Sequence, residues 1–474
     1  MLRNRLRFTY ALLITACATN PATGKREFTL VSESQEIAMG QDGKQSVLKE
    51  SAVVGDSALQ RYVSGVGMAM AKTTERPSVP WSFIVLDDPA VNAFALPGGP
   101  IFITRGILTH MMSEAEMASV LGHEMGHVTA RHSVRQMTNA ELAQVGLVAG
   151  SILSPRIAQL GDIAQTGLGL LFLKFGRGDE LQADELGFKY SLNNGYDVRE
   201  MANMFRVLDK ISGGPEGRIP EWQSTHPNPD NRVANTEARI TALNRSLSGT
   251  KVGRDEFLAR IDGLVFGENP RDGFFESNVY HHPDLRFRVD FPAGWQTQNQ
   301  STQVVGVSGA KDAMMVVSAA AAGTPSQLLS AFLGQQGIQA GRTSSQSINA
   351  LPAAWGEFAA QPDANTTIAG TVAFVSHNGS NYRLLTYAPT ARAASYAGVF
   401  QQAIGSFRPE TDPKVLAVKP NRVRLVKLSR AMTITEFNAA NPSSIPIALL
   451  AIINGVEPTQ TIPAGSFVKR VIVE

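Results

Sequence analysis

The stretch Ser113–His132 reads SEAEMASVLGHEMGHVTARH and contains the pattern H-E-x-x-H. Two histidines four positions apart, His123 and His127, lie one turn apart on the same face of a helix, so both imidazoles can reach one Zn²⁺. Glu124, beside the first histidine, is then placed to take a proton from a water molecule at the metal. The S-x-x-E box that opens the stretch, together with the apolar run behind it, predicts a helix that begins after Ser113.

The motif on its own leaves two interpretations open: a metal site, or a helix whose histidines are surface or satisfied core residues. A catalytic zinc takes three protein ligands and keeps an open position. The next imidazole, His132, is a poor third ligand because, at about 100° per residue, it lies roughly 140° around the helix from His127. We therefore interpret His132 as a surface or structural residue.

A better third ligand follows in the block GDELQADELG at residues 178–187. Glu180 and Asp184 are four residues apart, so their carboxylates share one helix face. One carboxylate could bind the metal while the other accepts the ring N–H of a ligand histidine, as is usual around metal-bound histidines. A solvated acidic first turn is the alternative, since Asp and Glu favour helix starts.

The composition is that of a globular protein large enough for two to four domains. The 474 residues are 43% hydrophobic and 7% aromatic. With 43 Lys+Arg against 41 Asp+Glu, the charge balance gives no indication of a nucleic-acid partner.

The N-terminus has the pattern of an export signal. A basic segment, Met1–Arg7, precedes a short apolar run, Phe8–Ala16, which is far below the roughly 20 residues needed to span a bilayer. The run ends in Ile-Thr-Ala-Cys, which resembles the lipobox of bacterial lipoproteins, and Cys17 is the only cysteine of the chain. We expect residues 1–16 to be removed and Cys17 to carry acyl chains that anchor the protein to a membrane. An ordinary secretory signal with a chance cysteine is the alternative.

Between the signal and the motif helix, the sequence predicts a tether, a helical stretch and a hairpin. Residues 18–35 are polar and rich in turn formers, and residues 36–76 have helical periodicity. Val79–Asp87 and the run at 101–108 are strand-like, and the Pro-Gly-Gly turn at 97–99 between them is a hairpin signal.

Residues 141–175 are poor in charge, but Pro155-Arg156 and Gly161-Asp162 interrupt the run, so no apolar stretch reaches membrane-spanning length. We favour a buried or membrane-facing helical pair beside the site over a transmembrane hairpin. Further helices are predicted for VREMANMFRVLDKI and NRVANTEARITALNRSL, on either side of the segment STHPNPDNR at 224–232.

The texture of the sequence changes near residue 265. Short alternating strands with one helical piece, SQLLSAFLGQQG, run to about Phe407 and predict an α+β domain that is mostly β. Pro409–Pro413 predicts a linker, and residues 414–474 predict the order strand, helix, helix, strand. We interpret His281-His282 as a strand end rather than a second metal site.

Four motifs in this order resemble a known family: NAFALPGG at 92–99, HEMGH, ELQADE at 180–185, and STHPNPDNR. They are similar to the signature of the gluzincin metallopeptidases of the HtpX / CAAX prenyl protease family, and in particular to their soluble periplasmic lipoprotein members of the BepA type. The resemblance covers roughly residues 20–245. It favours the metal-site interpretation over the alternatives left open above.

The resemblance implies a role for each matching residue of the site. It implies one zinc ion per chain, bound by His123, His127 and Glu180. Glu124 would be the general base, and Asp184 would orient a ligand histidine.

The resemblance extends to the substrate side. His226 would approach the metal as a fourth ligand that blocks the open position, and Arg232 would lie near the substrate oxyanion. A helix-capping turn is the alternative for this segment. The edge strand along which an extended peptide pairs would be formed by Asn92, Ala93, Phe94, Ala95, Pro97, Gly98 and Gly99.

Beyond the peptidase the chain departs from the BepA type, because no helical repeat with a period of about 34 residues follows. The final piece is similar in layout to a LysM domain, on the residues Arg422–Leu428, Thr433–Phe437, Leu450–Gly455 and Ile462–Gly465. The usual G-D-T before the first helix is replaced by Ala431-Met432-Thr433. A scaffold reused for protein contacts is therefore as good an expectation as glycan binding.

Together these features predict a multidomain protein. We expect a mainly α, zincin-like metalloprotease domain with a small β edge sheet, then an α+β, mostly β domain, and last a small LysM-like βααβ domain. The predicted boundaries are 1–17 for the signal peptide and lipobox, 18–35 for the tether, 36–264 for the peptidase, 265–408 for the α+β domain and 414–474 for the LysM-like domain.

The leading hypothesis is a zinc endopeptidase, tethered in the bacterial periplasm, that hydrolyses misfolded or stalled envelope proteins. Ala18 after the cysteine, by resemblance to enterobacterial sorting rules, favours the outer membrane. The alternative is a latent protease that acts as a chaperone-like binding protein docked to outer-membrane assembly proteins or peptidoglycan. An integral membrane protease, held by a hairpin at 141–175, is the third possibility.

Overall fold

The computed structural model describes residues 17–140, 175–212, 222, 226, 231–363 and 366–474. The chain forms two compact units. One combines the chain up to Gly267 with Asn421–Glu474, and the other spans Glu268–Pro420. The C-terminal residues, which the sequence predicted as a domain of their own, therefore pack in the same unit as the motif helix.

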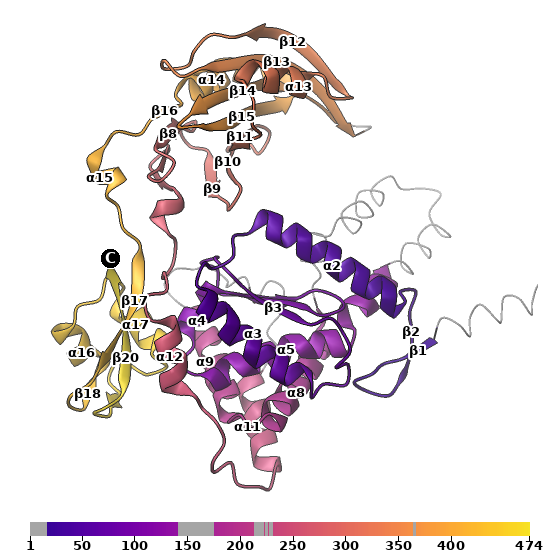
Figure 1. The fold of residues 1–474 in the computed structure, drawn as a ribbon, viewed down its shortest axis with the longest axis vertical. Helices are drawn as coiled ribbons and strands as arrows, with labels where there is room; N and C mark the ends of the chain where they lie inside the picture. Colours follow the sequence, from indigo (N-terminus) through magenta and orange to yellow (C-terminus); the bar gives the residue numbers. More distant parts are fainter. Residues whose placement is uncertain (1–16, 141–174, 213–221, 223–225, 227–230, 364–365) are drawn as a thin grey trace, which may run out of the picture. The chain divides into compact units, whose positions relative to one another are not determined.

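A three-stranded sheet in the first unit contains the predicted hairpin (Figure 1). Its order is β3 (Ser82–Leu86), β5 (Pro100–Thr104), β4 (Ala93–Ala95), with β5 parallel to β3 and antiparallel to β4. The turn between β4 and β5 needs its glycines, because Gly98 and Gly99 have φ angles of +70° and +116°. Within the described residues β4 is an edge strand of this sheet, as predicted.

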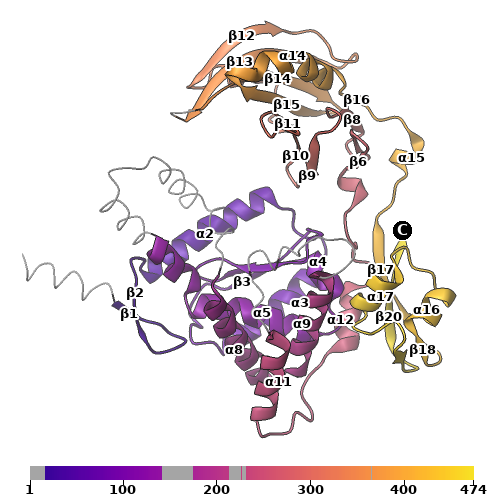
Figure 2. The ribbon, with the colours of Figure 1, turned by 180° about the vertical axis from the view of Figure 1, so that it is seen from behind.

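Helix α2 (Glu33–Glu50) packs on one face of this sheet, and α3 (Ser57–Ala71) and α5 (Glu114–Thr129) pack on the other. The unit also contains α4 (Arg105–His110), α8 (Arg177–Asn193), α9 (Arg199–Ser212), α11 (Arg232–Ala242) and α12 (Arg254–Ile261). Side chains of β5 alternate between the faces: Phe102 packs with Val47 of α2, whereas Ile101 and Ile103 join the core built by α3 and α5. Figure 2 shows the same unit from behind.

Two predictions for this unit need correction. The strand predicted at 101–108 is only half right, since β5 ends at Thr104 and the following residues form α4, whose first turn is capped by the Thr104 hydroxyl. The segment predicted as a tether folds into a hairpin of β1 (Cys17–Thr19) and β2 (Arg26–Phe28), after which α2 begins. The buried Asn20 side chain donates to the carbonyl of Ala130 at 2.9 Å, so the hairpin is fixed to the end of α5.

The C-terminal module, residues 421–474, has the predicted order of elements. β17 (Asn421–Lys427) pairs antiparallel with β20 (Phe467–Val473), and between them lie β18 (Met432–Thr433), α16 (Ile434–Ala440), α17 (Ile447–Ile453) and β19 (Thr461–Ile462). Backbone hydrogen bonds from Gly263 to Val423 and from Val423 to Leu264 join β17 to the chain that follows α12.

The second unit is mostly β, as predicted. One sheet has the order β16-β8-β7-β6 and the other the order β12-β13-β14-β15-β11-β10-β9. The strands are β6 (Phe274–Glu276), β7 (Val279–His282), β8 (Phe287–Asp290), β9 (Gln296–Asn299), β10 (Gln303–Val307), β11 (Met314–Ala320), β12 (Ile338–Ser344), β13 (Ala353–Asp363), β14 (Thr366–His377), β15 (Ser380–Pro389) and β16 (Arg408–Pro409). The 3-10 helix η2 (Pro270–Asp272) precedes β6, and the α-helices are α13 (Pro325–Leu333), α14 (Thr390–Gly405) and α15 (Pro413–Leu416).

Sequence reasoning missed one element of the second unit and placed another correctly. Helix α14 was not predicted, although it is as long as α5, because its residues, TARAASYAGVFQQAIG, have few strongly apolar positions. His281-His282 do end strand β7, and the buried His281 ring contacts Glu410 rather than a second histidine.

The charge-poor segment predicted as a helical pair or hairpin lies, except for Phe175, outside the described residues, as does the predicted signal segment 1–16. None of the helices in the described residues combines the length and apolar character that a membrane crossing needs.

Candidate metal centre

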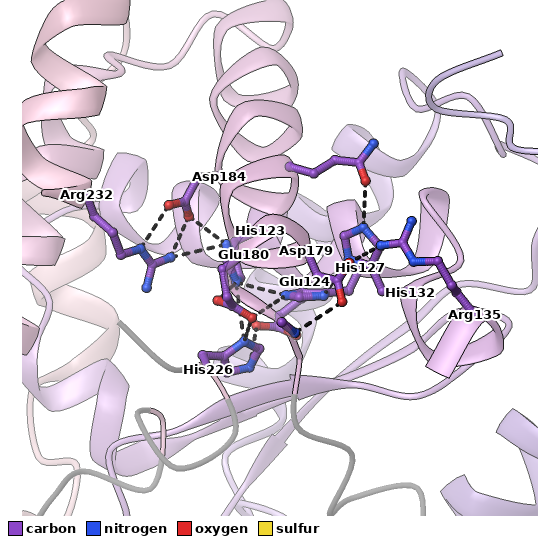
Figure 3. Close-up of polar contacts among 12 residues, drawn as sticks. His123, Glu124, His127, His132, Arg135, Asp179, Glu180, Asp184, His226 and Arg232 are labelled. Atoms are coloured by element: carbon purple, nitrogen blue, oxygen red, sulfur yellow. Dashed lines mark hydrogen bonds and ion pairs between the residues drawn. The ribbon is translucent and has the colours of Figure 1, made fainter. Parts of the chain in front are cut away.

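Helix α5 presents the two motif histidines from the centre of the first unit (Figure 3). The helix begins as predicted, with the Ser113 hydroxyl accepting from Glu116 N–H. The capping box is incomplete, since the Glu116 carboxylate accepts instead from the backbone of Met112. Every residue of α5 is buried, and the Nε2 atoms of His123 and His127 lie 3.1 Å apart.

Helix α8 brings Glu180 to this pair because glycines allow the two helices to approach closely. A Cβ at Gly126 would lie 3.0 Å from Ala183, and one at Gly187 would lie 2.8 Å from the backbone nitrogen of His123. The carboxylate oxygens of Glu180 lie 3.4 Å from His123 Nε2 and 3.5 Å from His127 Nε2.

His226 completes the cluster. Its Nδ1 lies 3.1 Å from a Glu180 oxygen and 3.4 Å from His123 Nε2. Trp222 stacks on the imidazole of His226 with ring centroids 4.3 Å apart, and Phe175 stacks on His127 at 4.0 Å. The four residues that the sequence suggested as ligands, with His226 as the fourth, thus come together in the fold.

The hydrogen bonds around the histidines leave their Nε2 lone pairs facing each other. His123 Nδ1 lies 2.9 Å from the Asp184 carboxylate, so this nitrogen carries the proton. His132 Nε2 donates to the Gln182 side-chain oxygen, so His132 Nδ1 carries no proton and accepts a hydrogen bond. The donor to it is His127 Nδ1, 2.9 Å away, which leaves His127 Nε2 without a proton. Two bare nitrogens 3.1 Å apart repel each other unless a proton or a metal ion lies between them.

The cluster therefore fits a metal ion. His123, His127, Glu180 and His226 each offer one ligand atom, and these atoms lie within 4.8 Å of one another and are buried. Glu180 Oε2 is buried with no hydrogen-bond partner among the described residues, as expected of an atom reserved for a metal. Histidine and carboxylate ligands in this number are typical of zinc.

Glu124 is the second unusual feature of the centre. Its side chain is 1% exposed, yet neither carboxylate oxygen has a hydrogen-bond partner among the described residues. Its Oε1 lies 3.6 Å from His226 Nε2. Burial raises the pKa of Glu124, and the nearby imidazoles of His226 and His123 oppose that rise. A buried carboxylate of this kind is suited to accept and return a proton.

Arg232 lies behind the ligands. Its Nε donates to the Asp184 carboxylate at 2.9 Å, and its guanidinium stacks over the Phe205 ring at 4.0 Å. Burial alone would raise the pKa of Asp184, but the Arg232 cation and the His123 ring N–H hold it below its ordinary value. Asp184 therefore contacts both His123 and Arg232. That Asp184 orients a metal-bound histidine, and that Arg232 lies at the oxyanion, stay predictions.

His132 is the residue that sequence reasoning placed least well. It is fully buried beside His127, so the structural interpretation is confirmed and the surface one is wrong. The estimate of its direction assumed a continuous helix, but α5 ends at Thr129, and Arg131 has a φ of +55° that turns the chain back. No local pattern signals that turn.

The backbone of β4 offers an open edge beside the centre. Asn92 and Leu96 bond inward to β5, through Thr104 N–H to Asn92 O and through Leu96 N–H to Pro100 O. Because bonding directions alternate along a strand, residues 91, 93 and 95 point their backbone groups outward. The backbone N–H of Trp222 already donates a hydrogen bond to the carbonyl of Val91, with an N–O distance of 3.4 Å. The role of the NAFALPGG segment in binding substrate stays a prediction.

The paired helices and the buried ligand cluster define a metallopeptidase centre. Residues 57–240 match the model of peptidase family M48, so the chain contains a peptidase M48 domain. Within it lie all the candidate metal ligands, Glu124 and the β4 edge.

Similar proteins agree with this family. The mitochondrial metalloendopeptidase OMA1 of Arabidopsis thaliana is 31% identical over 237 residues, which are 47% of this chain and 47% of that protein. The beta-barrel assembly-enhancing protease of Escherichia coli (strain K12) is 28% identical over 236 residues, 48% of each chain. The OMA1 of Schizosaccharomyces pombe is 32% identical over 226 residues, 46% of this chain and 64% of that protein.

The match thus spans about half the length of the Arabidopsis and Escherichia relatives. The M48 domain of this chain is that of a metalloendopeptidase.

Proposed function

We propose that this protein is a zinc-dependent endopeptidase that cleaves unfolded polypeptides. The observation that carries the proposal is the buried carboxylate of Glu124, which lies beside four convergent ligand atoms and finds no hydrogen-bond partner among the described residues. A buried carboxylate without a partner lowers the unfolding free energy. Such groups are retained in native proteins where they take part in a reaction.

The residues of the centre divide the work of peptide hydrolysis. His123, His127 and Glu180 would hold the zinc ion, which when bound acidifies water and polarises the scissile carbonyl. Glu124 takes the proton from the attacking water and returns it to the leaving amine. Asp184, fixed by Arg232, keeps the proton of His123 on Nδ1 and so leaves Nε2 available as a ligand.

The β4 edge would position the substrate. An extended peptide that pairs with the outward groups of residues 91, 93 and 95 adds a strand to the sheet, which recognises backbone rather than sequence. Such recognition suits unfolded chains, because only they offer a free strand. Arg232 or His226 would stabilise the oxyanion of the tetrahedral intermediate.

His226 supports a second role. Because its Nδ1 lies among the ligand atoms, we propose that it occupies the open metal position at rest, as a plug that must leave before water and substrate enter. A protein in which the plug never leaves would be a latent peptidase, acting as a chaperone-like binding protein. The retained Glu124 favours the active form, since a binding protein has no use for a base.

We further propose that the protein works in the bacterial periplasm, anchored by lipid on Cys17 and sorted to the outer membrane by Ala18. The lipobox-like sequence supports this placement, as does the likeness to a protease named for β-barrel assembly. Misfolded or stalled envelope proteins would be its substrates, with outer-membrane assembly proteins or peptidoglycan as docking partners. Mass spectrometry of the N-terminal peptide tests the anchor: an unmodified Cys17 in membrane fractions would exclude it.

Casein cleavage by the purified full-length protein tests the catalytic proposal. We expect cleavage by the wild type, loss of cleavage with full zinc content in Glu124→Gln, and no change in Glu185→Gln, an exposed carboxylate of α8 that serves as control. His226→Ala should cleave faster if the plug exists. Zinc bound without cleavage in any variant would favour the latent binding protein, and absence of zinc would exclude the metal site.

A further inference from the structure

The C-terminal module places a buried lysine at the junction between α4 and the catalytic helix α5. Lys469 of β20 is 0% exposed, and its Nζ donates at 2.8 Å to the carbonyls of both Thr109 and Met111. These carbonyls end helix α4, where helices leave C=O groups without partners and where a cation is favoured. Three hundred and fifty-eight residues of sequence separate Met111 from Lys469, so this contact exists only in the folded unit.

The lysine is itself held in place by Asn454, the asparagine of the L-A-I-I-N-G motif after α17. The Asn454 amide donates to Lys469 O at 2.9 Å and accepts from Lys469 N–H at 2.8 Å, and it is 2% exposed. Gly455 follows with a φ of +65°, and a Cβ there would lie 3.6 Å from the side chain of Met112. Asn454 is thus buried within the module and fixes the backbone of Lys469, while Gly455, which stays exposed, lies beside Met112 of the peptidase.

The contact reaches the catalytic residues through one short segment. Met111 and Met112 join α4 to the cap of α5, and the Met112 N–H donates to the Glu116 carboxylate in the first turn of α5. His123 and His127 follow on the same helix, which is buried along its whole length. Because a buried helix moves as a unit, the position of its first turn sets the position of both histidines.

We propose that Lys469 is a positioning residue for the peptidase centre, and that the C-terminal module is a built-in part of the catalytic unit. The module holds the α4–α5 junction so that His123, Glu124 and His127 meet the residues supplied by α8. This inference rests on the proposed peptidase activity, and it assigns to the asparagine of a LysM-like motif the task of aligning a catalytic helix.

Replacement of the lysine cation tests the proposal in the full-length protein. For Lys469→Met we expect a fall in kcat of about 10- to 100-fold with KM within about twofold, because small misplacements of catalytic groups lower turnover rather than substrate binding. Asn454→Ala, which keeps the lysine but removes its support, should show a smaller fall. Lys427→Met is the matched control, because Lys427 is an exposed lysine on the neighbouring strand β17.

Zinc affinity provides a readout that does not depend on cleavage. Competition with a chelator should show about 10-fold weaker zinc binding in Lys469→Met and none in Lys427→Met, because disturbed support of ligand residues has effects of that size. If the wild type binds zinc but cleaves nothing, the proposed activity fails while this comparison still decides the positioning role.

Two outcomes would overturn the inference. Folded Lys469→Met protein with unchanged kcat and unchanged zinc affinity would show that the lysine only stabilises the fold. If Lys469→Met does not fold, the decision passes to Asn454→Ala, and wild-type kcat and zinc affinity in that variant would overturn the inference equally.

Discussion

The two ends of helix α5 hold buried carboxylates in opposite states. At the start, Glu114 accepts hydrogen bonds from the hydroxyls of Tyr62 and Tyr196, each at 2.7 Å, and from the Lys251 ammonium. Glu124, five residues before α5 ends at Thr129, is equally buried, but neither of its carboxylate oxygens has a hydrogen-bond partner among the described residues. The first carboxylate stabilises the fold, and the second is kept open for chemistry.

Comparing Glu114 with Glu124 shows how a structural buried carboxylate can be told from a functional one in this protein. Both residues are about 1% exposed and both lie on one helix, so neither burial nor sequence position distinguishes them. What distinguishes them is whether other elements supply partners. Most buried polar atoms of native proteins are satisfied, so an unsatisfied one needs a reason.

The largest effect is expected for Glu124→Gln. The variant should lose about 10²- to 10⁴-fold in kcat, which is the usual contribution of a general base. The unfolding free energy of the metal-free protein should not fall, because the carboxylate has no hydrogen bond to lose. Chemical denaturation in the presence of a chelator measures this unfolding free energy. A clear decrease would contradict the proposed contrast between Glu124 and Glu114.

Glu114→Gln is the matched change at the other end of the helix. It should lower the unfolding free energy by about 2 kcal/mol, because hydrogen bonds to a charged group are replaced by weaker ones to an amide. Turnover by the protein that remains folded should be unchanged. Equal unfolding free energies of Glu114→Gln and the wild type would show that the hydrogen bonds to the Glu114 carboxylate do not stabilise the fold.

The pH dependence of stability tests the structural role of Glu114. Burial alone raises the pKa of Glu114, but the Lys251 ammonium and the two tyrosine hydroxyls hold it below its ordinary value of 4.5. A carboxylate with a depressed pKa stabilises the fold above about pH 4.5, and that stabilisation is lost as the pH falls through the folded pKa. Denaturant midpoints measured from pH 6 downward should therefore converge for wild type and Glu114→Gln.

Asp184→Asn should have an intermediate effect on the metal. The amide no longer accepts the His123 ring N–H as a charged partner, and such supporting residues are worth about 10- to 100-fold in metal affinity. Chelator competition checks this value. An unchanged zinc dissociation constant would mean that the Asp184–Arg232 pair serves the fold alone.

At neutral pH the smallest effect is expected for His110, beside the α4–α5 junction. Burial lowers the pKa of His110 to about 4, against 6.5 in the unfolded chain. The unfolded state therefore takes up a proton first, and this residue should reduce stability by at most about 1.4 kcal/mol per pH unit between pH 6.5 and 4. In His110→Phe that part of the pH dependence should disappear, and a variant with the wild-type profile would contradict the assignment.

Much of the metal centre could be predicted from sequence, because its spacings are local. The four-residue intervals between His123 and His127 and between Glu180 and Asp184 state which side chains share a helix face. The Pro-Gly-Gly turn could be predicted for the same reason, since only glycine tolerates the positive φ angles found there. In each case the chemistry of a few neighbouring residues determines the geometry.

Other features depended on contacts between distant parts of the chain. The close approach of α5 and α8 needs facing glycines and Ala183, and the contact between Arg232 and Asp184 joins residues 48 positions apart. Helix α14 escaped prediction because it has few strongly apolar positions. The helical half of the run 101–108 escaped prediction because its residues are compatible with strand as well as helix.

Local sequence rules were enough to predict the motif helix, its cap and the spacing of the candidate ligands and base, because each acts within one or two helical turns. Three features came only from the tertiary structure: Glu124 has no hydrogen-bond partner among the described residues while Glu114 has several, His132 turns back to His127, and Lys469 contacts the α4–α5 junction. The physical reason is that the hydrogen-bond partners of buried groups come from other elements. The local pattern of apolar and polar residues does not indicate which elements will pack together.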